Sequence, residues 1–140
     1  MAGARLVLDS GAVSALADAD PRALAWAAIA IHKQMPLGIP APVLAETTTG
    51  QKSDARVRRL IAPNETVLDT TAEVAFRAGR LRFRSRMPDA TIDALIVATS
   101  MSFAGSIILT GDPDDIGRLA SHADDPLSIA VRDVRSKPQK

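Results

Sequence analysis

Residues 106–112 read Ser-Ile-Ile-Leu-Thr-Gly-Asp, and this stretch decides the fold class. A short run of β-branched and apolar residues that is closed by a glycine predicts a buried strand. A run of the same kind, Arg5-Leu6-Val7-Leu8-Asp9, stands near the beginning of the chain. Continuous apolar strands are typical of parallel sheets that helices cover on both faces. Both runs therefore indicate an α/β protein.

Expected strands and helices alternate along the whole chain. The strands are expected at 5–8, 37–39, 66–68, 106–109 and 127–131, and the helices at 10–16, 21–34, 42–50, 57–61, 71–86 and 90–103. This alternation predicts a parallel sheet flanked by helices in one domain over residues 1–135. The polar residues 136–140 are expected to form a loose tail.

Composition excludes several classes of function. The chain has 140 residues, enough for one domain with a real core, and 46% of them are hydrophobic. It has no cysteine, which excludes disulfides, thiolate metal sites and a cysteine nucleophile, and its two histidines argue against structural zinc. No apolar run reaches the ~20 residues that span a bilayer, and no secretion signal is recognised. A cytoplasmic protein without membrane contact is expected.

Four carboxylates stand where expected strands end or expected helices begin. Asp9 and Asp112 follow the first and fourth strands, whereas Glu46 and Asp93 lie in otherwise apolar helical segments. Ligands of open parallel sheets bind at the carboxyl ends of the strands, so these acids share one crevice if the two strands are neighbours. Gathered acids repel one another, and a hard divalent cation is their natural partner. The sequence therefore predicts a metal site.

Helix capping is the competing explanation for some of these acids. Asp112-Pro113-Asp114-Asp115 is also a good helix start, and Asp9 would cap the next helix as well as Ser10 would. Glu46 would favour the helix dipole at its position. Asp93 lies about a turn into an apolar helix, where no capping role is open to it. Asp93 is thus the acid that most favours a metal site.

Arginines are concentrated in one expected helix. Arg77, Arg80 and Arg84 would share one side of it, and arginine suits bidentate contacts with phosphate. A solvated charged face is the competing interpretation. The chain has one Trp, three Phe and no Tyr, so base stacking is a poor prospect. Binding of nucleic acid is therefore expected to depend on backbone charge and shape.

Four blocks occur in the order and at the spacing of a known family: residues 6–10, 45–46, 93–99 and 108–116. Together they resemble a PIN domain, specifically a VapC-type toxin of a bacterial toxin–antitoxin pair, over nearly the whole chain. Asp89 begins a stretch that partly mimics the third block. Asp93 fits that block better because it leads the longer apolar helix.

The resemblance implies a five-stranded parallel sheet in the order 3-2-1-4-5 and a metal-dependent endoribonuclease. The family's acids carry over to Asp9, Glu46, Asp93 and Asp112, with Asp115 as a frequent second acid of the last block. Mg²⁺ or Mn²⁺ would be held by Asp9, Asp93, Asp112 and Asp115, with Glu46 as a ligand or water-orienting group. An RNA substrate, a VapB-like antitoxin and a homodimer are also implied.

Two other classes of function stay open. One is another magnesium-dependent phosphohydrolase or a phospho-acceptor domain, but such proteins often carry Asp-x-Asp after the first strand, and here Gly11 follows Asp9 at that distance. The other is a PIN-like scaffold that binds RNA or protein without catalysis. Loss of one or more acids would mark that state, and this chain retains all four.

Overall fold

A five-stranded parallel sheet lies at the centre of the protein. The computed structural model describes residues 3–63 and 65–138. Its strands are β1 (Leu6–Leu8), β2 (Leu37–Pro40), β3 (Val67–Leu68), β4 (Ser106–Thr110) and β5 (Ile129–Asp133). Their order is β3-β2-β1-β4-β5, and every neighbouring pair is parallel. The predicted fold class and strand order are confirmed.

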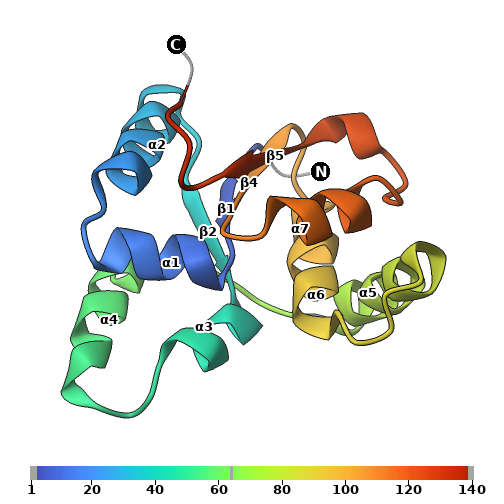
Figure 1. The fold of residues 1–140 in the computed structure, drawn as a ribbon, viewed down its shortest axis with the longest axis horizontal. Coiled ribbons are helices and arrows are strands. Elements are labelled where there is room, and N and C mark those ends of the chain that lie inside the picture. The colour runs from blue at the N-terminus through green and yellow to red at the C-terminus, as the bar shows by residue number, and fades with distance from the viewer. Residues whose placement is uncertain (1–2, 64, 139–140) are drawn as a thin grey trace.

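Helices cover both faces of this sheet. They are α1 (Ser10–Ala17), α2 (Pro21–His32), α3 (Ala41–Thr47), α4 (Ala55–Ile61), α5 (Ala72–Ser85), α6 (Thr91–Ser100) and α7 (Pro113–Ala120), with short 3-10 turns at Lys52–Asp54 and Pro126–Ser128. In Figure 1, α1, α2 and α4 lie on one side of the strands, and α5, α6 and α7 lie on the other. The helix α1 contacts β1 and β4, while α6 contacts β1, β2 and β4. The central strands are therefore enclosed from both sides.

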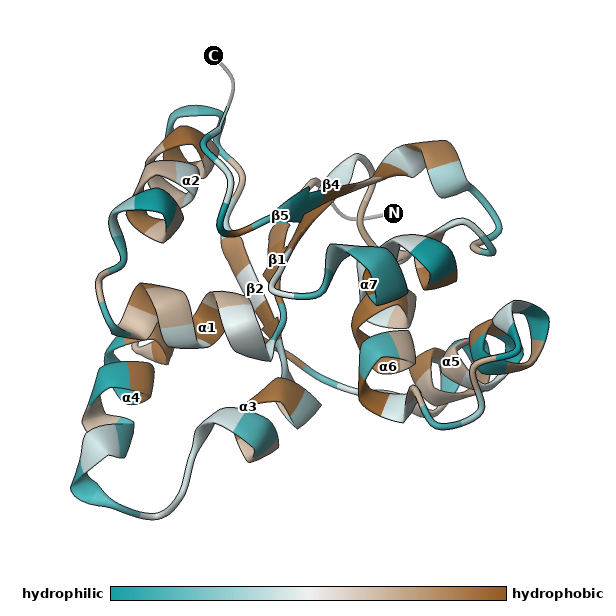
Figure 2. Ribbon diagram, in the orientation of Figure 1, coloured by the Kyte–Doolittle hydropathy of each residue, from teal (hydrophilic) through white to brown (hydrophobic). Residues whose placement is uncertain are grey.

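The core follows from the apolar strands and the apolar helix α6. All three residues of β1 are buried, and so are Ile108 and Leu109 of β4. Figure 2 shows these strands in brown, with teal residues on the outward turns of the surrounding helices. Each large aliphatic side chain that is fully buried contributes about 1.5–3 kcal/mol. The core thus fixes the strands whose carboxyl ends carry the acids.

Several expected element boundaries are wrong by one to three residues, and two of these differences have a clear structural cause. The helix that was expected to reach residue 50 ends at Thr47, because the hydroxyls of Thr47 and Thr48 donate to the carbonyls of Val43 and Leu44 and Thr48 is already extended. The last strand begins at residue 129 rather than 127. Leu127 lies in the preceding 3-10 turn and is 98% exposed, so it has no strand neighbour to pack against.

The chain end returns to α2. Trp26 is buried, and its indole nitrogen donates to the carbonyl of Ser136 over 3.0 Å. Trp26 therefore packs within the chain itself. The last two residues of the expected tail, 139–140, lie outside the described residues. Among the helices of residues 3–63 and 65–138, none has the length and hydropathy needed to cross a bilayer.

Candidate metal centre

The carboxyl ends of β1 and β4 meet at the crevice that the sequence predicts. These strands are parallel neighbours with Leu8 opposite Leu109. Asp9 follows β1 directly, and Asp112 follows β4 after one glycine. The first turns of α6 and α7 contribute Asp93 and Asp115. Four acids from three separate parts of the sequence thus converge at one edge of the sheet.

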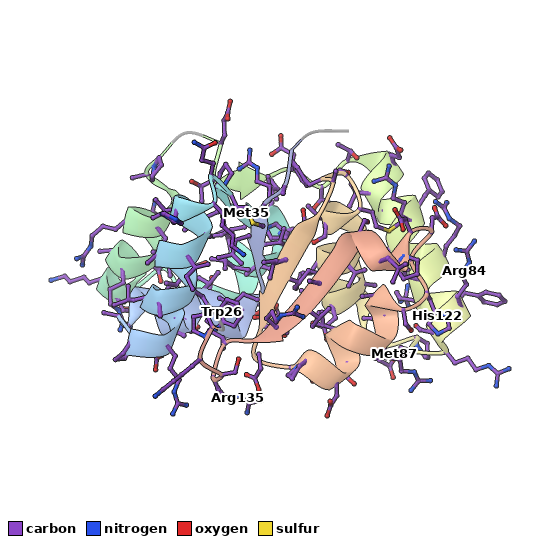
Figure 3. All side chains as sticks on the ribbon, turned by 90° about the horizontal axis from the view of Figure 1, so that it is seen from above. Trp26, Met35, Arg84, Met87, His122 and Arg135 are labelled. Carbon is purple, nitrogen blue, oxygen red and sulfur yellow. The ribbon has the colours of Figure 1, made fainter. Side chains whose placement is uncertain are left out.

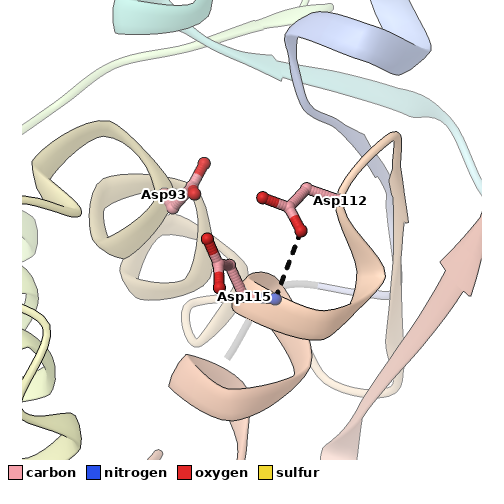
Figure 4. Close-up of side chains that lie close together, drawn as sticks. All are labelled: Asp93, Asp112 and Asp115. Carbon is pink, nitrogen blue, oxygen red and sulfur yellow. Dashed lines mark hydrogen bonds between the residues drawn. The ribbon is translucent and has the colours of Figure 1, made fainter.

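Three of these acids form a compact group, which we call the acid cluster: Asp93, Asp112 and Asp115. One carboxylate oxygen from each lies within 4.8 Å of the other two. Figure 4 shows the three side chains directed toward one another between α6 and the start of α7. An all-carboxylate donor set suits hard cations such as Mg²⁺, Mn²⁺ or Ca²⁺ rather than zinc or copper. The residues therefore fit a divalent cation.

Capping and clustering involve the same residue. Asp112 is the N-cap of α7, and its Oδ1 accepts from the backbone N–H of Asp115 over 3.3 Å. The dashed line in Figure 4 marks this bond. A carboxylate has two oxygens with several lone pairs, so one can cap a helix while the other binds a ligand. Capping is therefore confirmed for Asp112, and its carboxylate also belongs to the acid cluster.

The pKa values of Asp93 and Asp115 are both raised. Burial, followed by the charges of Asp112, Asp9, Asp115 and Glu46, raises the pKa of Asp93 from 3.8 to about 6. The charge of Asp112 is the main reason why the pKa of Asp115 is also raised. Like charges that crowd together disfavour ionisation unless a cation joins them. A cation bound at the acid cluster would therefore favour ionisation of these carboxylates.

Asp9 stands outside the acid cluster and is bonded by the protein itself. It is 5% exposed and accepts from the hydroxyl of Thr110, from the N–H of Gly111 over 3.1 Å and from the N–H of Ala12 over 2.9 Å. Asp9, not Ser10, thus caps α1. The N–H of Asp112 donates to the hydroxyl of Thr110 over 2.7 Å, so this threonine links the two acids.

Glu46 reaches the crevice from α3 and also stands outside the acid cluster. It is exposed, and its Oε1 accepts from the hydroxyl of Ser10. Its charge contributes to the raised pKa of Asp93, so it faces the same space. The hydroxyls of Ser10 and Thr110 thus both donate to carboxylates of the site. The structure therefore groups three predicted acids and arranges two others around them.

The sequence profile of the PIN domain family matches residues 6–121 of the chain. That match covers all four acids and every strand except β5. The chain belongs to the PIN domain family. No curated protein sequence matches it significantly. PIN domains are generally metal-dependent nucleases, and the acid cluster of this PIN domain is a possible site for the divalent metal that the family uses.

Two glycines bring the halves of this PIN domain together, which the sequence analysis did not identify. A Cβ at Gly11 would lie 3.1 Å from the Cα and 3.2 Å from the nitrogen of Gly111. Such a distance is tighter than an ordinary contact, so Gly11 allows the first turn of α1 to approach the turn after β4, whereas a Cβ at Gly111 would lie 3.4 Å from the Cα of Gly11 and be tolerated. The pair Asp9-x-Gly11 and Gly111-Asp112 carried that signal in the sequence.

The predicted RNA-binding arginines are largely engaged within the PIN domain. Arg77 donates to Glu73 over 2.6 Å and to Ser102 over 2.9 Å, and Arg84 pairs with Asp124 over 3.2 Å. Figure 3 shows Arg84 and His122 at one end of the molecule, with Trp26 and Arg135 far from them. Arg80 is exposed and has no ion pair or side-chain hydrogen bond among the described residues.

Aromatic side chains on α5 were missed by the sequence analysis. Phe76 and Phe83 are 73% and 86% exposed, seven residues apart on the same helix as the arginines. Exposed rings beside arginines are compatible with stacking on bases. The signal lay in their spacing, which places both on one side of a helix.

Proposed function

We propose that this protein is a metal-dependent endoribonuclease of the VapC type and acts as the toxin of a toxin–antitoxin pair. The observation that supports this most directly is the acid cluster, whose oxygens lie within 4.8 Å of one another at the carboxyl end of the sheet. Burial and, after it, the charges of the neighbouring acids raise the pKa of Asp93 to about 6. An RNA substrate fits the resemblance of the four sequence blocks to VapC toxins.

The five acids of the site have two proposed roles, which are binding a cation and orienting a water molecule. Asp93, Asp112 and Asp115 would hold one or two Mg²⁺ or Mn²⁺ ions, and Asp9 would contribute directly or through a water. A bound cation lowers the pKa of a water and offsets charge on the scissile phosphate. Glu46, whose carboxylate is fixed by Ser10, would orient the attacking water from the α3 side. Asp9 is held in place by its three donors.

The direct test is cleavage of structured RNAs, including tRNA, by the purified chain. Reactions would contain Mg²⁺ or Mn²⁺, with EDTA in parallel. Asp93→Asn removes one charge from the acid cluster, and Asp114→Asn removes one charge from an exposed acid of the same turn that is not in the cluster. We expect defined fragments with the wild type and with Asp114→Asn, and none with EDTA or with Asp93→Asn.

Other outcomes would assign the protein differently. RNA binding and divalent binding without cleavage would favour the PIN-like binding module. Cleavage that persists in EDTA, or that survives Asp93→Asn at the normal rate, would contradict the metal mechanism. Calorimetry with Mg²⁺ or Mn²⁺ separates these cases, because the proposal requires an interaction that weakens in Asp93→Asn.

The toxin role is a further part of the proposal and has its own test. A nuclease that attacks cellular RNA would arrest growth when it is expressed alone in a bacterial host, and Asp93→Asn would not. A VapB-like antitoxin would place an arginine among the acids and thereby oppose cation binding. Rescue of growth by a small protein encoded beside this one would support that partner. Growth that continues normally with an active nuclease would contradict the toxin role.

Substrate binding and assembly complete the proposal. Arg77, Arg80 and Arg84 remain proposed contacts for the RNA backbone, with Arg80 as the one that has no internal partner among the described residues. A homodimer is proposed on the family resemblance. Light scattering at micromolar concentration tests it, and a mass equal to one chain of 14.8 kDa would contradict it.

A further inference from the structure

A surface cavity of about 440 Å³ adjoins the acid cluster. Its lining consists of the connection between α5 and α6, residues 86–90, together with Asp93 and Asp115. Cavities that bind small ligands have volumes of about 300–1,000 Å³. Arg86 is the only cationic side chain among its described lining residues. The cavity therefore combines one arginine with two acids of the proposed metal site.

Arg86 adopts a backbone conformation that glycine would adopt at lower cost. It is the C-cap of α5 with φ 57° and ψ 43°, in the left-handed region. Its N–H donates to the carbonyl of Phe83 over 3.2 Å, and the N–H of Met87 donates to that of Arg82 over 3.0 Å, which closes the helix. A residue with a Cβ loses about 1–2 kcal/mol in this conformation. The backbone of this turn does not require arginine at position 86, so the turn geometry does not explain the arginine side chain.

The guanidinium of Arg86 has no partner among the described residues, unlike the arginines around it. Arg82 donates to the carbonyl of Pro88, and Arg118 donates to that of Ser85 over 2.7 Å. On the β5 side of the crevice, Arg135 is bound to Asp133 over 3.0 Å. Figure 3 shows Met87, the neighbour of Arg86, at the α5 end of the molecule and Arg135 well separated from it. Arg86 is exposed and forms neither an ion pair nor a side-chain hydrogen bond within residues 3–63 and 65–138.

We propose that Arg86 binds a backbone phosphate of the substrate strand beside the acid cluster and thereby positions the strand for cleavage. This inference rests on the proposed nuclease function. Arginine matches the geometry of phosphate with two parallel hydrogen bonds. Asp93 and Asp115 on the same cavity repel a phosphate until a divalent cation offsets their charge. The contribution of Arg86 to binding therefore depends on the cation.

A binding experiment measures this contribution separately from catalysis. Fluorescence anisotropy would follow a labelled single-stranded RNA of mixed sequence with the full chain in Ca²⁺, over a range of salt concentrations. Arg86→Gln removes the proposed contact. Arg59→Gln is the matched control, because Arg59 is an exposed arginine on α4, across the sheet from α5 in Figure 1. A DNA strand of the same sequence distinguishes a phosphate contact from a contact with the ribose.

We expect Arg86→Gln to weaken RNA binding about tenfold, as for loss of a charge-assisted bond. The slope of log K against log salt should become smaller by about 0.7, the value for one phosphate of a single strand. Arg59→Gln should leave both quantities unchanged. Arg86→Lys should recover part of the affinity because it keeps the charge and loses the bidentate geometry. Arg86→Gln should weaken binding of the DNA strand by the same factor as binding of the RNA.

Arg86→Gly separates binding from folding. Glycine relieves the left-handed conformation, so the unfolding temperature of this variant should equal or exceed that of the wild type. Its RNA affinity should fall as far as that of Arg86→Gln. In cleavage reactions with Mg²⁺, both variants should raise KM about tenfold and change kcat little.

Three results would overturn the inference. Wild-type affinity and salt slope in both Arg86→Gln and Arg86→Gly would show that no phosphate is bound there, while cleavage by the wild type would leave the nuclease proposal intact. An equal effect of Arg59→Gln would show that only net charge matters. A wild-type chain that neither binds nor cleaves RNA with any divalent cation would overturn the nuclease proposal and this inference together.

Discussion

Asp9 and the acid cluster share one crevice, yet they differ in how their negative charge is stabilised. Asp9 is buried and accepts hydrogen bonds from Thr110, Gly111 and Ala12. Asp93 is half-buried, faces four other acids, and accepts no hydrogen bond from the described residues. The protein thus supplies three donors to Asp9, whereas the acid cluster accepts one hydrogen bond among the described residues, from the N–H of Asp115 to Asp112. Hydrogen bonds from the protein hold Asp9 in place, whereas the carboxylates of the acid cluster have few such bonds.

The largest expected effect concerns Asp112, the proposed metal ligand that also caps a helix. Asp112→Asn should reduce cleavage by about 10²–10³-fold, a loss of the size found when one charge-stabilising group is removed from an active site. Stability should change little, because asparagine caps a helix as well as aspartate does. Cleavage rates and thermal unfolding measure both quantities, with Asp114→Asn as control. A large loss of stability would mean that Asp112 serves mainly as the cap of α7, through the oxygen that accepts from Asp115.

Asp9→Asn tests the fixed side of the crevice. An amide offers an N–H where the carboxylate accepts from Thr110 or Gly111, so one of those bonds is lost and a buried donor is left unpaired. The expected cost is about 1–3 kcal/mol of unfolding free energy. Chemical denaturation without divalent cations measures it. A variant as stable as the wild type would show that these donors do not stabilise the charge.

Asp93→Asn tests the free side and should change stability in the opposite direction. The native environment disfavours the ionised carboxylate, as its pKa of about 6 shows. Removing the charge at pH 8 should therefore stabilise the cation-free protein by about 1–2 kcal/mol, after allowance for partial exposure. The measurement is chemical denaturation in EDTA, and the same experiment at pH 3.5 is the control, where the two proteins should be nearly equal.

The pH dependence follows from the same pKa. Between pH 3.8 and about 6 the folded chain holds a proton on Asp93 that the unfolded chain has released. The contribution of Asp93 to the free energy of unfolding is therefore fully present below pH 3.8 and is lost as the pH rises through 6. Bound protons compete with cations, so Mg²⁺ affinity should fall up to about tenfold per pH unit below pH 6. Calorimetric titration tests this, and Asp93→Asn should show a weaker pH dependence.

The smallest expected effect concerns the glycines that join the two sides. Gly11→Ala would place a Cβ 3.1 Å from the backbone of Gly111, which must move by a few tenths of an ångström. A cost of about 1 kcal/mol is expected, at the lower end for overpacking. Gly117→Ala is the control, since a Cβ there meets nothing within 4 Å. Equal stabilities of the two variants would mean that the turns yield without cost.

The parts of the site that the sequence predicts are those that depend on strand order. Asp9 and Asp112 follow apolar runs that read clearly as strands, and Asp93 stands out as a charge in an apolar helix. Parallel sheet geometry then brings their positions to one edge. The strand order itself came from the family resemblance. Neither source reveals whether a given carboxylate accepts protein hydrogen bonds or remains free, because that depends on the positions of side chains.

The parts that sequence reasoning missed depend on turns and on partners that are distant in the chain. Arg86 resembles its neighbours in sequence, and only its left-handed backbone and the cavity beside it distinguish it. Arg84 and Asp124 are separated by 40 residues, so no local pattern predicts their pairing. The N-cap of α6 is Ala90, which forms no side-chain cap bond, so no capping residue in the sequence marks the start of this helix.

The hydrogen bond between Thr110 and Asp9 joins residues that are 101 positions apart, and this separation has a consequence for the order of events during synthesis. A ribosome adds about 5–20 residues per second, and long-range strand pairing waits until both strands have emerged. Before β4 is made, β1 has only β2 as a neighbour, Asp9 lacks two of its donors, and Asp112 and Asp115 do not yet exist. Truncated chains released early would therefore carry no assembled site.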